Sequence, residues 1–179
     1  IRAIALQKDL VVLEATMRVQ SLSDSWVVDQ PVKTQKAEKN KRVVVIGAAG
    51  AVGLSTIKVL ASHNYSLLLQ HRGSTNKISK LQPLLKNCDV RYSVADLENS
   101  LDIKKLTKII SKLDDLYAVV YLASPPIDSP IDRLVAINYS AFKEIAEAAL
   151  DNMLVKQRGL VLYVSSTAMF YHSDRLQDY

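Results

Sequence analysis

Apolar residues follow two different periods along the 179-residue chain, and the period changes near residue 43. Over residues 13–20 apolar and polar side chains alternate, which predicts a β-strand. A turn-rich stretch at 21–25 and a second extended stretch at 26–32 follow, and together they predict a β-hairpin within residues 1–32. Because two strands alone are only marginally stable, this hairpin is expected to dock on the domain that follows it, on a partner chain or on a missing upstream domain.

From residue 43 onward, apolar runs alternate with stretches of helical period. Continuous apolar runs suit strands that are buried on both faces of a parallel sheet. The expected strands cover 43–46, 66–70, 89–94, 117–122 and 159–164, and the expected helices cover 51–63, a short segment interrupted near Pro83, 103–113 and 130–153. This order predicts an α/β domain over residues 43–179, with a doubly wound parallel sheet of the Rossmann type.

Individual residues predict the faces and ends of these helices. Val52, Val59 and Leu60 are expected to point from the first helix toward the sheet. Ser129 is expected to cap the long helix that Pro130 starts. The helix before it is expected to bury one face, made of Ile103, Leu106, Ile110 and Leu113.

Three glycines in a G-x-x-G-x-x-G spacing join the first strand of this domain to its helix. Gly47 allows a sharp turn off the strand, Gly50 allows the backbone to approach a pyrophosphate, and Gly53 allows the helix to lie close to the sheet. The positive N-terminal end of the helix then points at the phosphates. Together with Ala49 and Val52, these glycines are predicted to bind a dinucleotide.

The end of the second strand lacks the carboxylate that an NAD site uses to bind the adenosine ribose. It offers Gln70, His71 and Arg72 instead, followed by Ser74 and Thr75. A guanidinium pairs with the additional phosphate of NADP, whereas a carboxylate repels it. His71 and Arg72 are therefore predicted cofactor-binding residues, and NADP(H) is the predicted cofactor.

The formal net charge of +5 is concentrated in one segment. Residues 33–42 contain five basic residues and one acidic residue, with no apolar period and no aromatic residue among them. This composition predicts a solvated basic linker, so no nucleic-acid partner is expected.

Cysteine and histidine usage adds two expected absences. Cys88 is the only cysteine and the three histidines have no second ligand at metal spacing, so neither a disulfide framework nor a metal site is expected. A reducing, cytoplasmic location is expected, and no apolar run is long enough to span a membrane. The chain begins at Ile1 without a methionine, which predicts a piece of a longer protein.

Taken in order, several short motifs resemble those of the short-chain dehydrogenase/reductase family. They are Gly47-Ala48-Ala49-Gly50-Ala51-Val52-Gly53, then Ala95-Asp96-Leu97, Leu122-Ala123-Ser124-Pro125, Asn138 in the long helix, and Val164-Ser165-Ser166. The resemblance covers about residues 42–179. It implies a Rossmann-type fold and an oxidoreductase that uses a nicotinamide cofactor.

The resemblance also implies roles for individual residues. Asp96, followed by Leu97, would lie against the adenine, and Ala123 and Ser124 would line the cofactor. The implied catalytic residues are Ser166, Tyr179, which lies thirteen positions later, and Asn138, which would hold a proton-relay water.

Two departures from the family's pattern leave alternatives open. Tyr121-Leu122-Ala123-Ser124 stands where the family usually has Asn-Asn-Ala-Gly, and it is more similar to the extended branch of epimerases and reductases. The family's lysine, four residues after the tyrosine, would lie beyond Tyr179, where this sequence ends. The last strand would then leave an edge unpaired, so the 179 residues are expected to be an inactive, self-associating part of a larger protein.

These features favour an NADPH-dependent carbonyl reductase that acts on a ketone or a 3-oxoacyl thioester. The thioester is suggested by residues 10–32, which resemble the final strands of a hotdog-fold acyl-thioester dehydratase. A homo-oligomer or a longer polypeptide is expected. The alternatives are a non-catalytic dinucleotide-binding module, acting as a redox sensor or as the structural half of a multidomain ketoreductase, and an extended-type epimerase or reductase.

Overall fold

The chain divides into two compact units, Ile1–Lys33 and Thr34–Tyr179. A computed structural model describes residues 2–7, 10–16, 41–73, 78–79 and 82–165. In the first unit, β1 (Arg2–Gln7) pairs antiparallel with β2 (Leu10–Thr16).

A hairpin is therefore present, but its strands are not the predicted ones. β2 overlaps the predicted strand at 13–20, and its partner is β1, in residues for which no strand was predicted. The alanines of β1 carry little strand preference, which hides the strand from pattern analysis. The predicted turn at 21–25 and strand at 26–32 lie outside the described residues.

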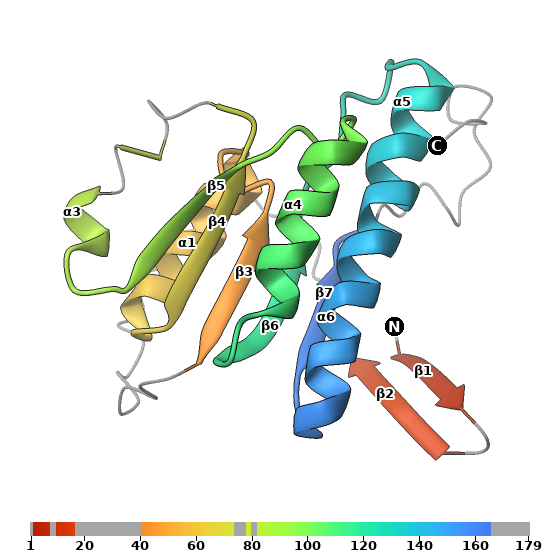
Figure 1. Ribbon diagram of the computed structural model, residues 1–179, viewed down its shortest axis with the longest axis horizontal. Helices are drawn as coiled ribbons and strands as arrows, with labels where there is room; N and C mark the ends of the chain where they lie inside the picture. The colour runs from red at the N-terminus through yellow and green to blue at the C-terminus, as the bar shows by residue number, and fades with distance from the viewer. Residues whose placement is uncertain (1, 8–9, 17–40, 74–77, 80–81, 166–179) are drawn as a thin grey trace, which may run out of the picture. The chain divides into compact units, whose positions relative to one another are not determined.

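The second unit is built on five parallel strands in the order β5-β4-β3-β6-β7 (Figure 1). They are β3 (Arg42–Ile46), β4 (Ser66–His71), β5 (Val90–Val94), β6 (Leu116–Tyr121) and β7 (Leu160–Tyr163). The chain adds strands on one side of β3 and then on the other, which is the doubly wound arrangement predicted from the sequence. The direction of winding changes between β3 and β6, so a crevice is expected at their carboxyl ends.

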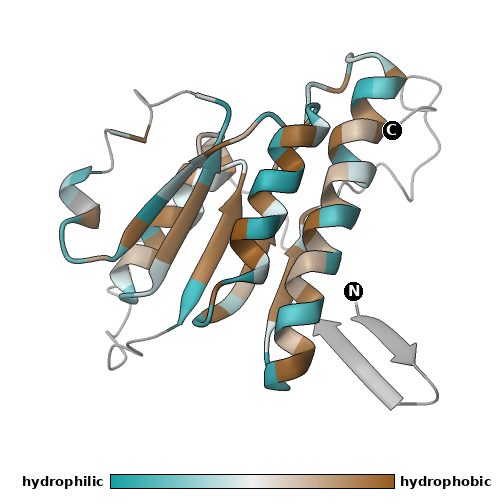
Figure 2. Ribbon diagram, in the orientation of Figure 1, coloured by the Kyte–Doolittle hydropathy of each residue, from teal (hydrophilic) through white to brown (hydrophobic). Residues whose placement is uncertain are grey.

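Helices cover both faces of this sheet. They are α1 (Ala51–Ser62), α3 (Gln82–Leu85), α4 (Ser100–Ser111), α5 (Ile131–Val135), the π-helix η1 (Ala136–Ala141) and α6 (Phe142–Lys156). Val44 and Ile46 of β3 pack in one core with α4, η1 and α6, whereas Val43 and Val45 pack in another with α1. Strand β3 is accordingly apolar after Arg42 (Figure 2), whereas β5 also carries polar residues.

The inward face of α1 differs from the prediction. Val52 and Val59 are 58% and 56% exposed, and the buried residues are Gly53, Ile57 and Ala61. The four-residue spacing of this buried set begins at a glycine, because the start of α1 lies too close to the preceding loop for a larger side chain. Hydrophobicity alone selected the valines and therefore the wrong face.

Two further predictions concern α4 and the long helix that follows β6. The predicted buried face of α4, containing Ile103, Leu106 and Ile110, is confirmed. The predicted helix at 130–153 is present as α5, η1 and α6 in succession. Its N-cap is Pro130 without a side-chain hydrogen bond, so the predicted capping by Ser129 is wrong.

Strand β7 is covered less completely than its apolar run predicted. Val161 and Tyr163 pack against the core beside α6, but Leu160, Leu162 and Val164 are exposed. As the last strand in the sheet order, β7 pairs only with β6 among the described residues.

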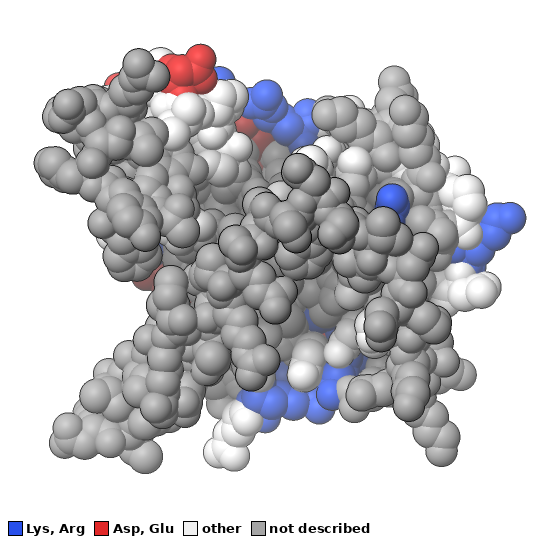
Figure 3. All heavy atoms as spheres, turned by 180° about the vertical axis from the view of Figure 1, so that it is seen from behind, with Lys and Arg blue, Asp and Glu red and all other residues white. Residues whose placement is uncertain are grey.

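Charged side chains are dispersed on the surface of the described residues. Figure 3 shows basic side chains in several separate places on one face, with acidic ones near its upper edge. None of the described helices is both long enough and apolar enough to cross a membrane.

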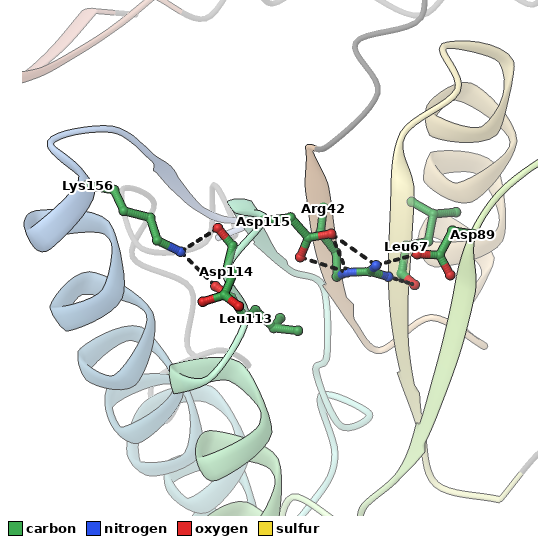
Figure 4. A network of polar contacts seen from close by, with 7 residues as sticks. All are labelled: Arg42, Leu67, Asp89, Leu113, Asp114, Asp115 and Lys156. Carbon is green, nitrogen blue, oxygen red and sulfur yellow. Dashed lines mark hydrogen bonds and ion pairs between the residues drawn. The ribbon is translucent and has the colours of Figure 1, made fainter.

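Arg42 corrects the prediction that residues 33–42 are a solvated linker (Figure 4). It is the first residue of β3 and is only 1% exposed. Its Nε donates to both carboxylate oxygens of Asp115, at 3.0 and 3.1 Å, and its Nη1 donates to the Leu67 carbonyl at 3.3 Å. Its Nη2 pairs with Asp89. One guanidinium thus joins the amino ends of β3, β4, β5 and β6.

The pKa of Arg42 reflects this network. Burial alone would lower it, but hydrogen bonds and charges from Asp115 and Asp89 raise it above the ordinary value. Nearby, Lys156 at the end of α6 donates to the carbonyls of Leu113 and Asp114, at 2.8 and 2.7 Å. The amino-terminal edge of the sheet is therefore held together by cations that reach across from other elements.

Replacing Arg42 by Met tests how much the network contributes. The change keeps most of the side-chain volume and removes the donors, so we expect the free energy of unfolding to fall by about 2–3 kcal/mol. Urea-induced unfolding measures the loss, and the exposed Arg91→Met in β5 is the matched control. An Arg42→Met loss no larger than that of the control would show that packing can replace the network.

Candidate functional site

A cleft of about 280 Å³ opens at the carboxyl ends of β3, β4, β5 and β6. The structure brings most of the predicted cofactor-binding residues to its walls: Gly47, Ala49, Gly50, His71, Arg72, Asp96, Leu97, Ala123 and Ser124. Val52 is exposed and Gly53 is buried, and neither belongs to the lining. The cleft lies where the sheet order reverses, the usual ligand position in such folds.

Two glycines allow the loop beneath the cleft to be compact. Gly47 has φ +80°, and a Cβ there would lie 2.7 Å from the backbone nitrogen of Ala123. A Cβ on Gly53 would lie 2.4 Å from the Gly47 carbonyl oxygen. The turn and the start of α1 therefore close tightly on each other, as a phosphate-binding loop requires.

Gly50 faces more open space at the rim of this loop. It is exposed and has an extended backbone, and its N–H donates to the Gly47 carbonyl at 3.0 Å. A Cβ there would meet only the Gly47 oxygen, at 3.3 Å. The loop therefore fits the diphosphate of a dinucleotide, which would pack against backbone rather than against side chains.

Gln70 holds the glycine loop in place through hydrogen bonds. Its buried side chain accepts from the Gly47 N–H at 2.8 Å and donates to the Ala95 carbonyl at 2.7 Å. Its own carbonyl accepts from the Ala48 N–H at 2.9 Å. The structural role of Gln70 was not predicted, although a polar residue that ends a run of leucines is a usable signal.

His71 is a buried, neutral wall of the cleft. Its Nδ1 accepts from the Gly73 N–H at 3.1 Å, and its ring lies edge-on to Tyr92, with centroids 6.4 Å apart. Burial lowers the pKa of His71 below its usual value. The proton of the neutral ring is thus assigned to Nε2.

Asp96 is fixed mainly through backbone hydrogen bonds. Its N–H donates to Asp102 Oδ2 at 3.1 Å, and its own Oδ1 accepts from the Glu98 N–H at 3.1 Å. The hydrogen bond from the Asp96 N–H lowers the pKa of Asp102, with a smaller contribution from Lys105. Asn99 then caps α4, accepting from the N–H of Leu101 at 2.9 Å.

Arg72 and Arg133 both line the cleft and both approach Glu98. Arg72 Nη1 lies 3.5 Å from Glu98 Oε2, and Arg133 Nε lies 3.1 Å from the same oxygen. Of these two arginines, only Arg72 was a predicted site residue, and Arg133 was not predicted. The only available signal was a basic residue in the first turn of the helix that follows the cofactor loop.

The predicted catalytic residues are only partly described. Asn138 lies in η1, and its buried Oδ1 has no hydrogen-bond partner among the described residues. Asn138 does not line the cleft, but its neighbour Ile137 does. Ser166 and Tyr179 lie outside the described residues.

Tyr121 connects the π-helix to the core. Its hydroxyl donates to the Ile137 carbonyl, and its ring stacks on Tyr163 and meets Phe142 edge-on. Burial, with a contribution from Tyr163, raises the pKa of Tyr121 well above its usual value, so the phenol stays protonated. Single π-helical turns occur often at functional sites.

The described residues provide no candidate metal centre. No group of three or more His, Cys, Asp and Glu side chains is placed to hold an ion within the described ranges.

Comparison with known proteins supports one family. Residues 41–179 match the short chain dehydrogenase family. A Danio rerio protein named very-long-chain 3-oxoacyl-CoA reductase-B is 23% identical over 163 residues, which are 82% of this chain and 51% of the relative. The chain thus spans about half the length of this curated relative.

Solved structures share the fold at low sequence identity. A metagenomic short-chain oxidoreductase in complex with NADP has a TM-score of 0.71 at 19% identity, covering 80% of this chain and 69% of its own. An NAD⁺-bound xylitol dehydrogenase has a TM-score of 0.65 at 19% identity, covering 78% and 58%. The match across residues 41–179, together with the doubly wound sheet and its glycine-lined cleft, places this chain in the short-chain dehydrogenase family of oxidoreductases.

Proposed function

We propose that this protein is an NADPH-dependent carbonyl reductase. The observation that carries the cofactor choice is the end of β4, where Gln70, His71 and Arg72 line the cleft and no carboxylate follows the strand. An NAD site places an acidic residue there to bind the ribose hydroxyls. Arg72 offers the opposite charge, which suits an additional phosphate.

The relatives do not decide the cofactor by themselves. One structural neighbour holds NADP and another holds NAD⁺, and both share the fold. The choice therefore depends on this chain's own charges. The carboxylate of Glu98, on the turn before α4, is paired with Arg72.

The walls of the cleft suggest how a dinucleotide would be held. The backbone of the glycine loop would take the diphosphate, and Asp96 and Leu97 would lie against the adenine. Ala123 and Ser124 would line the remainder of the cofactor. When bound, the nicotinamide would supply hydride to a carbonyl carbon.

The proton-transfer roles are proposed from the family resemblance. Tyr179 would donate a proton to the substrate oxygen, and Ser166 would hydrogen-bond the same atom. A phenol with an unperturbed pKa of about 10 needs a nearby cation to act at neutral pH. Asn138 would hold a water in the proton relay, and its Oδ1, which has no hydrogen-bond partner among the described residues, supports this role.

The substrate class we favour is a ketone, with a 3-oxoacyl thioester as the specific candidate. The Danio rerio relative's name supports the thioester. The competing function is a non-catalytic dinucleotide-binding module. An extended-type epimerase or reductase also fits, because residues Tyr121–Ser124 depart from the family's usual Asn-Asn-Ala-Gly pattern.

In the full-length protein, Ser166→Ala should abolish thioester reduction and leave NADPH binding intact. Binding without reduction by the unsubstituted protein would instead favour the module.

The domain organisation, location and assembly of the protein are also proposals. We propose a separate N-terminal hairpin at residues 1–32, a basic linker ending near β3, and a cytoplasmic protein that forms a homo-oligomer or belongs to a longer polypeptide. Size-exclusion chromatography of the full-length protein tests the oligomer.

Arg72→Ala tests the cofactor proposal. We expect the unsubstituted full-length protein to bind NADPH more tightly than NADH, and the substitution to remove most of that difference. One charge-assisted contact corresponds to roughly a ten- to hundredfold change in affinity. Isothermal titration calorimetry measures both cofactors, with Arg91→Ala as the control. Equal affinities of the unsubstituted protein for the two cofactors would contradict the proposal.

Gly50→Val tests where the diphosphate lies. The extended backbone at Gly50 accommodates valine, but the branched side chain would occupy the rim of the cleft, so both cofactors should bind at least tenfold more weakly. The melting temperature should change little. Gly53→Ala is the contrasting variant, because its Cβ would meet the Gly47 oxygen and should lower the melting temperature. Unchanged cofactor affinity in Gly50→Val would place the diphosphate elsewhere.

A further inference from the structure

Two arginines from distant parts of the chain converge on one carboxylate oxygen beside the cleft. Arg72 directly follows β4, Arg133 belongs to α5, and Glu98 lies between β5 and α4. Both guanidinium groups approach Glu98 Oε2, at 3.5 Å from Arg72 and 3.1 Å from Arg133. Segments that follow β4, β5 and β6 thus meet at a single anion.

The contact leaves Arg133 incompletely satisfied. Its Nε is buried and has no hydrogen-bond partner among the described residues, because the nearby Glu98 oxygen lies outside hydrogen-bonding geometry. A buried donor without an acceptor is costly, so the position favours an anion with more oxygens and better-placed lone pairs. Arg133 also lines the cleft, which gives such an anion access to it.

We propose that Arg72 and Arg133 together form the site for the additional phosphate of NADP, and that the Glu98 side chain occupies this site until the phosphate displaces it. This inference rests on the proposed NADPH dependence. A phosphate monoester carries nearly two negative charges and three acceptor oxygens, whereas a carboxylate carries one charge and two oxygens. Two guanidinium groups therefore match the phosphate better than they match Glu98.

Glu98 is suited to leaving. Its side chain is 36% exposed, so the carboxylate can turn into water. Its backbone stays fixed, because the Glu98 N–H is bound by Asp96 Oδ1 and the next residue, Asn99, caps α4. Displacement thus needs rotation of one side chain and leaves the turn that carries Asp96 in place.

The pairing has a consequence for specificity. The energy of separating Glu98 from the arginines is subtracted from the binding of NADPH, whereas NADH, which lacks the additional phosphate, does not require the separation. Removing the charge of Glu98 should therefore strengthen NADPH binding alone. Removing Arg133 should weaken NADPH binding alone.

The test uses calorimetry of the full-length protein with NADPH and NADH at low ionic strength, where charge interactions are least screened. The variants are Glu98→Gln, Arg133→Ala and the double variant. Glu147→Gln on the exposed side of α6 and Arg91→Ala on β5 are the matched controls. Adenosine 2′,5′-bisphosphate and adenosine 5′-monophosphate serve as a second pair of probes, which differ only in the 2′-phosphate, the additional phosphate of NADP.

We expect Glu98→Gln to raise the NADPH affinity by about two- to fivefold and Arg133→Ala to lower it by about tenfold, with NADH unchanged. The gain from Glu98→Gln should shrink in the double variant, because the two residues act on the same phosphate. An unchanged or lower NADPH affinity in Glu98→Gln overturns the inference, as does an equal loss for both cofactors in Arg133→Ala. If NADPH preference persists and depends on Arg72 in either case, the proposed function stands without this inference.

Discussion

The buried charge of Arg42 is the constraint on which the sheet depends. A guanidinium that is removed from water is tolerated only when its donors find partners, and here they come from the residues that precede or begin three other strands. Since Asp89 and Asp115 lie just before β5 and β6, their pairing with one side chain fixes where these strands enter the sheet. The contacts of Arg42 at the amino ends of the strands therefore help to set the register of the strands. The register in turn determines where the carboxyl ends lie relative to one another.

Gln70 performs the corresponding task at the carboxyl edge. It links the glycine loop after β3 to the backbone after β5, so the two loops that flank the cleft are joined through the end of β4. A neutral amide suits this position because it both donates and accepts, which no carboxylate or cation can do at neutral pH. Gln70, the polar residue near the end of β4, therefore holds the glycine loop in place as well as lining the cleft.

Much of the fold and part of the site could be predicted from the sequence. Apolar runs predicted β3, β4 and β6, because these strands are buried on both faces, and the glycine spacing located the cleft. Arg42 was assigned to the linker, since a local pattern cannot show that Asp89 and Asp115 are close in space. Val52 was wrongly predicted to face the sheet, because hydrophobicity does not reveal how closely α1 must approach Gly47. Arg133 was missed for the reason that applies to Arg42, because its partner Glu98 is distant in the sequence and adjacent only in the fold.

The π-helical turn shows how the core can determine the geometry of a site. Tyr121 stands where the resemblance leads one to expect an asparagine, and its ring is fixed between Tyr163 and Phe142. Its hydroxyl binds the carbonyl of Ile137, the residue before Asn138. The backbone hydrogen bonds of this π-helical turn differ from those of an α-helix. The hydroxyl of Tyr121 gives the Ile137 carbonyl a hydrogen-bond donor, so this buried acceptor is satisfied. Because an aromatic cluster moves less freely than a single polar side chain, the placement of Asn138 takes its rigidity from the packing between β6, β7 and α6.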